Sequence, residues 1–290
     1  MNVFRMVVFR RLIIIWLGLY SLTITPLQAW GDEGHYWVTR KALRMLPPAL
    51  QQHFSDWERT LVDNSILADL RKADDPAEAP KHYLNLDAYG DYPFPDFTVK
   101  RDILEKRWGR ETVSKNGTLL WTIESTYHQL VDAFRQRDEQ RIVQLAADLS
   151  HYVADLHQPF HAALNYNGQL TNQHGIHFRF EGDLFLHFQH RVSFRPRALE
   201  RFDTVKGQSL AWIKESFLLV ESILEADAAI VSELRINRRN YRKGNRTLPY
   251  PDEYYRRLWE KTGDLLVRRL NQAAWAVASL WHMAWQEGTR

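Results

Sequence analysis

The stretch that decides the fold is His151-Tyr152-Val153-Ala154-Asp155-Leu156-His157-Gln158-Pro159-Phe160-His161. It closes a helical run that we expect to begin at Asp138. His151 and Asp155 are four residues apart, so they project from one face of that helix, one turn from each other. Pro159 ends the helix, and His161 follows from the turn beyond it. The stretch therefore predicts a helix end that presents nitrogen and oxygen donors together.

A second His/carboxylate pair with the same spacing follows in His177-Phe178-Arg179-Phe180-Glu181. Zinc takes imidazole nitrogen and carboxylate oxygen as ligands. One such pair is common on solvated helices and carries little weight. Two pairs and His161 within the segment 151–181 favour a metal site over a set of buried histidines satisfied by hydrogen bonds.

The composition limits the kind of site. The chain has 290 residues, enough to bury a large core, and it is rich in aromatic residues, with 11 Trp. It contains no cysteine, which excludes both a disulfide framework and a thiolate metal site. Any metal must be held by His, Asp, Glu, backbone groups or water.

The first residues resemble a targeting segment rather than part of the fold. Arg5, Arg10 and Arg11 form a basic region, an apolar region covers 12–24, and Ala29 is a small residue suited to cleavage. A single membrane anchor is the alternative, but the apolar run is short for a bilayer. We expect residues 1–29 to be a signal peptide and residues 30–290 to form one secreted or periplasmic catalytic domain.

The net charge gives no argument for nucleic-acid binding. Of the 38 Lys and Arg residues, three lie in the expected signal peptide, which has no acid, so 35 remain against 35 Asp and Glu. The mature domain is therefore neutral overall. The basic run at 235–246 is interpreted as a solvated Arg-rich loop, with a local basic surface as the alternative.

Apolar residues that recur at intervals of three and four predict a helical protein. The expected helices cover 34–46, a segment that starts at Pro48, 99–108, 119–135, 138–158, 180–192, 210–235 and 252–287. We find no series of strands, no phosphate-binding Gly-rich loop and no Gly-x-Ser-x-Gly turn. The sequence predicts an all-α, single-domain helical bundle with metal ligands contributed by several helices and loops.

Cleavage after Ala29 would create a further group of donors. The freed α-amine and the carbonyl of Trp30 and the imidazole of His35 would lie within six residues, in Trp30-Gly31-Asp32-Glu33-Gly34-His35. These groups can form a metal clip at the mature N-terminus. A buried Trp beside a capping His is the alternative.

Taken together, these motifs resemble one superfamily. The Trp30/His35 start, His151-x3-Asp155-x5-His161 and His177-x3-Glu181 are similar to the motifs of bacterial zinc-dependent phospholipase C and of the single-strand-specific zinc nucleases of the P-one type. The resemblance spans the mature chain. It implies an all-α fold, three zinc ions, and hydrolysis of phosphate ester bonds.

The resemblance also implies three sets of ligands. Trp30 and His35 would hold one zinc, with Asp155 shared; His82, His151, Asp155 and an upstream Asp would hold the second; His161, His177 and Glu181 would hold the third. The upstream carboxylate is either Asp69, thirteen residues before His82, or Asp74, eight before it, and we select Asp69.

The expected chemistry is metal-assisted hydrolysis. Two zinc ions about 4 Å apart lower the pKa of water and neutralise charge in an in-line transition state, and a third can stabilise the leaving oxygen. Asp69 is the candidate catalytic residue, because it can orient or deprotonate the attacking water as well as bind zinc.

The residues divide on the substrate. Glu181 and the lack of cysteine fit the phospholipases, whereas the short Trp30-x4-His35 spacing and Tyr83, which can stack on a base, fit the nucleases. Asn85 departs from the nuclease pattern, and Leu70 and Ala79 leave no aromatic cage for choline.

The sequence gives a slight preference for phospholipase C activity, with a single-strand nuclease or 3′-nucleotidase as the alternative. A non-catalytic zinc-binding exported protein is the third hypothesis. The expected partners are a phospholipid or single-stranded nucleic acid substrate, with transient contact to a membrane surface. We expect a monomer without an obligate protein partner.

Overall fold

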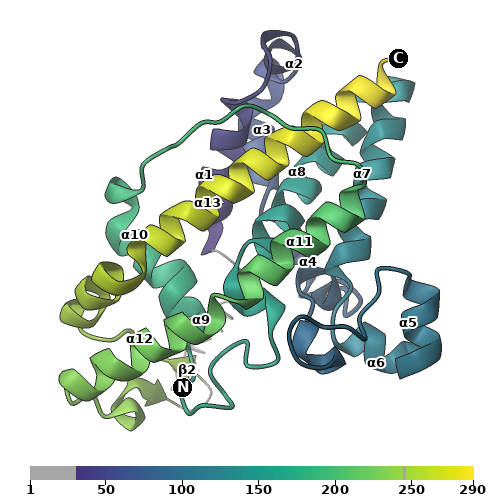
Figure 1. The fold of residues 1–290 in the computed structure, drawn as a ribbon. Helices are drawn as coiled ribbons and strands as arrows, with labels where there is room; N and C mark the ends of the chain where they lie inside the picture. Colours follow the sequence, from purple (N-terminus) through teal and green to yellow (C-terminus); the bar gives the residue numbers. More distant parts are fainter. Residues whose placement is uncertain (1–30, 244–245) are drawn as a thin grey trace, which may run out of the picture.

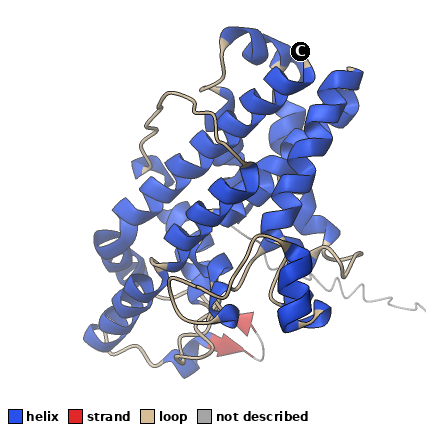
Figure 2. Ribbon diagram, turned by 45° about the vertical axis from the view of Figure 1, so that its right-hand side comes forward, coloured by secondary structure: helices blue, strands red, loops and turns tan. Residues whose placement is uncertain are grey.

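The computed structural model describes residues 31–243 and 246–290. In these ranges the only strands are β1 (Arg242–Lys243) and β2 (Arg246–Thr247), which pair antiparallel beneath a body built of helices (Figure 2). The expected all-α, single-domain helical bundle is confirmed. The expected signal peptide and Trp30 lie outside the described residues.

The helices differ widely in length. The long ones are α1 (Gly31–Leu43), α7 (Leu119–Gln136), α8 (Glu139–Leu156), α11 (Val205–Phe217), α12 (Val220–Glu233) and α13 (Asp252–Gly288). The short ones are α2 (Pro48–His53), α3 (Glu58–Asn64), α4 (Leu67–Arg71), α5 (Arg101–Trp108), α6 (Arg110–Lys115), α9 (Ile176–Phe178) and α10 (Leu184–Phe188). Single 3₁₀ turns are η1 (Ser55–Trp57), η2 (Ala79–His82), η3 (Leu86–Tyr89), η4 (Pro159–Ala162), η6 (Gln189–Arg191) and η7 (Arg238–Tyr241), and η5 (Arg179–Asp183) is a π-helix.

Helix α8 lies at the centre of the bundle. It begins at Asp138, whose side chain accepts a hydrogen bond from the backbone N–H of Arg141 at 3.1 Å and so caps the helix. The short connection through Arg137 makes α7 and α8 antiparallel neighbours. Helix α13 crosses both of them and also contacts α1 (Figure 1). The helix that carries His151 and Asp155 is therefore held on several sides.

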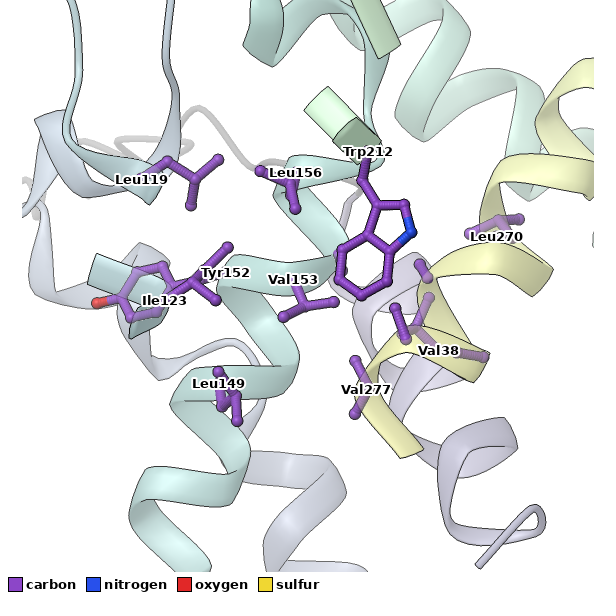
Figure 3. Close-up of a cluster of buried hydrophobic side chains, with 14 of the residues drawn as sticks. Val38, Leu119, Ile123, Leu149, Tyr152, Val153, Leu156, Trp212, Leu270 and Val277 are labelled. Carbon is purple, nitrogen blue, oxygen red and sulfur yellow. The ribbon is translucent and has the colours of Figure 1, made fainter. Parts of the chain in front are cut away.

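The core fills the space between these helices. Figure 3 shows Val153 of α8 next to Trp212 of α11, with Val38 of α1 and Val277 of α13 on the same side. All four side chains are buried. Burial of large apolar side chains contributes roughly 1.5–3 kcal/mol each, so this contact fixes the carboxyl end of α8 relative to α1, α11 and α13.

Two of the expected helices are interrupted. The segment after Pro48 forms α2, η1 and α3 instead of one helix, and the segment 210–235 forms α11 and α12, separated at Leu218 and Leu219. Helix α11 packs on α7 and η4, whereas α12 packs on α13. Because α11 and α12 pack on different elements, one straight helix could not bury both of their apolar faces.

The segment expected to be a helix at 180–192 is also irregular. It contains the π-helix η5, then α10 and η6. The π-helix buries Arg179, Phe180, Glu181 and Gly182. Single π turns inside α-helices often occur at functional sites, and this one carries Glu181.

Within residues 31–243 and 246–290, no helix combines the length and the apolar composition that crossing a bilayer requires.

Candidate metal centre

Seven separate elements bring the predicted ligands to one place. Helix α8 contributes His151 and Asp155 from one face, and the turn η4 directly after it contributes His161. The remaining donors are His35 on α1, Asp69 on α4, His82 on η2, His177 on α9 and Glu181 on η5. His177 is partly buried and the others are buried. Every predicted ligand in the described residues lies in this cluster, and Trp30 lies outside the description.

The carboxylate of Asp155 joins several of these groups. Its Oδ2 lies 2.9 Å from His82 Nδ1 and 3.3 Å from His151 Nε2. Its Oδ1 lies 3.6 Å from His35 Nε2 and 3.8 Å from His161 Nδ1. Because the two oxygens face different imidazoles, Asp155 can serve two metal positions at once.

The structure distinguishes between the two upstream acids. Asp69 is buried, and its Oδ1 lies 3.4 Å from His82 Nδ1 and 3.5 Å from His151 Nε2. Lys72, one helical turn further on, forms an ion pair with the same oxygen. Asp74 is exposed in the loop after α4. The geometry therefore brings Asp69, and not Asp74, to the cluster.

The donor atoms form three groups, each compact enough for one ion. The atoms within a group lie within 4.8 Å of one another. The groups are His35, Asp69 and His151; His82, His151 and Asp155; and His161, His177 and Glu181. The last set is one that the resemblance implied, and the second contains three of the four residues that the resemblance implied for another zinc. His35 was expected with Trp30 and Asp155; it lies near Asp155 and also stacks on His151, with 4.0 Å between ring centroids.

The outer nitrogens of three imidazoles are fixed by backbone carbonyls. His151 Nδ1 donates to Ser65 O at 2.7 Å, and His177 Nδ1 donates to Tyr166 O at 3.0 Å. His161 Nδ1 donates to His82 O at 2.5 Å. In each ring Nε2 is left to face the cluster, which is the arrangement that orients histidine for metal binding.

His82 has a different environment. Its Nδ1 faces the cluster, and its Nε2 lies 3.6 Å from Oε1 of the buried Glu78. Glu78 in turn accepts hydrogen bonds from the Tyr152 hydroxyl, Lys81 and Arg71. Glu78 was not among the predicted site residues, although Glu78 and His82 have the same spacing of four as His151 with Asp155 and His177 with Glu181.

Burial and charge shift the pKa values in opposite directions. Burial lowers the pKa of His35 to about 3 and that of His161 to about 4. Burial alone would also lower the pKa of His151, but the carboxylates of Asp155 and Asp69 raise it to about 10. Without a metal, an imidazolium at His151 therefore offsets part of the negative charge.

The cluster leaves several buried polar atoms unsatisfied. Within residues 31–243 and 246–290, no hydrogen-bond partner is present for His35 Nε2, His161 Nε2, Asp155 Oδ1 or Glu181 Oε1. Buried polar groups are nearly always hydrogen-bonded, so such a concentration requires an explanation. Nitrogen and oxygen donors that converge without thiolates fit zinc.

These residues lie within a segment that matches a known family. A family model described as S1/P1 Nuclease matches residues 30–190. The chain belongs to this family. A comparison with curated proteins finds no match. Members of the S1/P1 nuclease family are zinc-dependent phosphoric ester hydrolases, in the superfamily that also contains zinc-dependent phospholipase C. The family match confirms the superfamily and the enzyme class that the sequence motifs predicted.

Other histidines remain outside the centre. His157 lies outside the metal groups: its Nδ1 donates to Val153 O at 2.7 Å, and its ring lies against Trp212. His187 stacks on Tyr255, with 4.3 Å between ring centroids. Gln158, whose Nε2 donates to Glu181 Oε2 at 2.5 Å, was also not among the predicted site residues.

Proposed function

We propose that this S1/P1 nuclease family member hydrolyses single-stranded nucleic acid, using three zinc ions. The family establishes a zinc-dependent phosphodiesterase, and its name favours the nuclease over the phospholipase. The observation that carries the proposal for nucleic acid is a pair of tyrosines beside the metal groups, Tyr83 and Tyr166.

These tyrosines provide surfaces on which a base can stack. Tyr83 directly follows His82, is half-buried, and donates from its hydroxyl to Lys115 O at 3.1 Å. Tyr166 is 48% exposed, and its carbonyl accepts from His177. Burial, and then the electrostatic effect of Tyr166, raise the pKa of Tyr83. Stacking on an aromatic ring contributes about 1–3 kcal/mol per base.

A basic segment also fits a polyanionic substrate. The segment 234–251 contains Lys and Arg residues but no Asp or Glu. Arg238 is held by Asp227 at 2.6 Å, whereas Arg235, Arg239, Arg242 and Lys243 have exposed side chains. Tyr241 packs on Tyr250, which lies under Arg179 of η5, so this segment adjoins the element that carries Glu181. Exposed cations in that position can attract phosphates by long-range electrostatics.

The proposed ligand sets are those that the resemblance implied, with Asp69 as the upstream carboxylate. His82, His151, Asp155 and Asp69 would hold one zinc; His35, Asp155 and Trp30 would hold a second; His161, His177 and Glu181 would hold the third. Bound zinc would supply charge neutralisation at the phosphate and a lowered pKa for water. The protein side chains would orient the substrate and accept the proton of the attacking water.

Two of these residues have distinct proposed roles. Asp69 would orient the attacking water and accept its proton through a carboxylate oxygen. Burial alone would raise the pKa of Asp69, but His151 and Lys72 lower it, so the carboxyl is ionised and can act as an acceptor. Lys72 pairs with Asp69 and is partly exposed, so its ammonium would bind a phosphate oxygen at the open edge of the cluster.

The test compares substrates and one variant. The zinc-loaded protein beginning at Trp30 is assayed in parallel on single-stranded DNA and on phosphatidylcholine vesicles, with EDTA controls. EDTA-sensitive DNA cleavage without lipid hydrolysis is the expected result, and Asp69→Asn should reduce it by about 10²–10⁴-fold. Release of phosphocholine without DNA cleavage would establish the phospholipase alternative suggested by Glu181. Zinc binding without hydrolysis of either substrate would support the non-catalytic alternative.

The proposed role of Trp30 as a ligand requires a free α-amine on that residue. We propose that residues 1–29 are removed during export to the periplasm or medium, which frees the α-amine of Trp30, and that the mature domain 30–290 acts as a monomer. N-terminal sequencing of the exported protein should give Trp30 first. A fully active protein that retains residues 1–29 would contradict this.

A further inference from the structure

Gln158 connects two parts of the metal centre that the sequence places apart. It follows α8, which carries His151 and Asp155, and precedes His161 in η4. Its side chain is fully buried and reaches Glu181 on the π-helix η5, where Nε2 donates to Oε2 at 2.5 Å. The contact therefore joins the turn that carries His161 to the turn that carries Glu181.

The orientation of the Gln158 amide is determined by its other end. The backbone N–H of Phe160 donates to Gln158 Oε1, so this side chain also caps η4. A backbone N–H can only donate, and the end of the amide that faces it must be the oxygen. The opposite end, which faces Glu181, is therefore the NH₂ group, and its hydrogen bond to the carboxylate has a defined direction.

This hydrogen bond gives the two Glu181 oxygens different environments. Oε2 is contacted by Gln158 Nε2 and lies 2.5 Å from His177 Nε2. Oε1 is buried and has no hydrogen-bond partner in residues 31–243 and 246–290. His161 Nε2, from the same short turn as Gln158, also lacks a partner within that range. One carboxylate oxygen is fixed by the protein and the other remains available beside two imidazoles.

We propose that Gln158 is a positioning residue that holds the Glu181 carboxylate for the metal ion of the His161, His177 and Glu181 group. Without the amide, Glu181 would keep only His177 as a hydrogen-bonding neighbour and could rotate about its side-chain bonds. Groups that orient metal ligands typically change metal affinity by about 10–100-fold when they are removed. The proposal rests on the zinc ligation included in the proposed function, but not on the identity of the substrate.

The main test is Gln158→Met, which keeps the side-chain length and removes both hydrogen bonds. The measurement is the zinc dissociation constant of the full mature chain, by competition with a chromophoric chelator. We expect the most weakly held zinc to bind about 10–100-fold more weakly than in the wild type. Unchanged zinc affinity in a folded Gln158→Met protein would overturn the proposal.

Gln173→Met is a matched control. Gln173 is also a buried glutamine, and its Nε2 donates to a buried carboxylate, Asp227, at 2.7 Å. It belongs to none of the metal groups, so a merely structural loss should lower the melting temperature in EDTA without weakening zinc. Equal loss of zinc affinity in both variants would show a general effect of destabilisation and would also overturn the proposal.

A second variant keeps the test valid if Gln158→Met does not fold. Gln158→Glu retains the acceptor for the Phe160 N–H but replaces the donor with an oxygen that repels Glu181. Its zinc affinity near pH 8 should also fall, and wild-type affinity would contradict the proposal. Zinc binding is measured without any phosphodiester, so a wild-type protein that is inactive on DNA would end the proposed function and leave this inference intact.

Discussion

Asp155 Oδ2 lies 2.9 Å from His82 Nδ1, although the two residues are 73 positions apart in the chain. This contact ties the carboxyl end of α8 to the turn η2. The other oxygen of Asp155 faces His35 on α1. One buried carboxylate thus connects three elements, which makes it the residue whose loss should affect the metal centre most broadly.

We expect Asp155→Asn to lose at least one zinc ion and most of the activity. The substitution keeps the shape of the side chain but removes the charge that two metal positions would share. The decrease in kcat/KM should be on the order of 10³-fold, or about 4 kcal/mol of transition-state stabilisation. Zinc content by atomic emission and kcat/KM on single-stranded DNA are the measurements.

Asp227→Asn provides the comparison. Asp227 is equally buried, but it bonds to Arg238 and Tyr254 and belongs to none of the metal groups. Asp227→Asn should lower the stability of the fold and leave the zinc content unchanged. If Asp155→Asn retained its full zinc content and activity, the proposal that Asp155 serves two metal positions would be wrong.

Removal of metal should lower the melting temperature. The unsatisfied buried atoms His161 Nε2 and Glu181 Oε1 lose their ligand in EDTA, and the like charges of the carboxylates are no longer neutralised. A ligand present at about 100 times its dissociation constant stabilises the folded state by about 2.7 kcal/mol per ion. Calorimetry with EDTA and with added zinc measures the difference. A melting temperature independent of EDTA would argue against metal in the native centre.

Asp87→Asn should increase stability at neutral pH. Burial raises the pKa of Asp87, so the folded state holds its proton more tightly than the unfolded chain. For an acid with a raised folded pKa, the contribution to stability is greatest at low pH and falls as pH rises through the folded pKa. Asn removes the charge and can still accept from the Leu164 N–H, which donates to Asp87 at 2.8 Å.

The gain should stay below about 1.4 kcal/mol per pKa unit, because Asp87 is only partly buried and solvent screens its charge. Urea unfolding near neutral pH and below about pH 4 measures it, and the advantage should shrink at the lower pH. Asp132→Asn, at an exposed ion pair with Arg135, should change stability by less than about 0.5 kcal/mol at either pH. A variant less stable than the wild type at neutral pH would contradict the sign.

Arg269→Met should destabilise the fold strongly. Arg269 is buried in α13 and donates to the carbonyls of His157 and Trp212 and to the hydroxyl of Ser216. It therefore caps the carboxyl end of α8, where a cation also interacts favourably with the helix dipole. Removal leaves buried acceptors unpaired, at a cost of about 1–3 kcal/mol for each.

Thermal unfolding compares Arg269→Met with Arg59→Met, whose guanidinium is exposed and pairs with Asp63. The exposed variant should lie within about 0.5 kcal/mol of the wild type. Equal stability of the two variants would show that the buried guanidinium does not hold the helix end.

The central helices could be predicted from the sequence because their apolar spacing is regular. The segments 119–135 and 138–158 became α7 and α8 with boundaries shifted by one or two residues. The break between α11 and α12 could not be predicted in this way. The apolar spacing continues through Ile213, Val220 and Ile223, and no Gly or Pro marks the change, so only the separate packing partners of the two helices reveal it.

The candidate ligands could also be predicted because their spacing in the sequence is regular. The sequence alone shows the spacing of four residues in each His/carboxylate pair, His151 with Asp155 and His177 with Glu181. Ser65 had no such signal, because it orients His151 through its carbonyl, which every residue possesses. Arg269 meets His157 across 112 positions, and no local pattern encodes that contact. Residues that hold ligands in place are thus harder to find than the ligands.

The contact between α1 and α13 has a consequence for synthesis of the protein. These helices lie at opposite ends of the described chain, and α13 also covers α7 and α8. Local helices can form early, but the core between them cannot close before α13 has left the ribosome. The packing of α1, α7 and α8 into one core is therefore completed only after α13 has been synthesised.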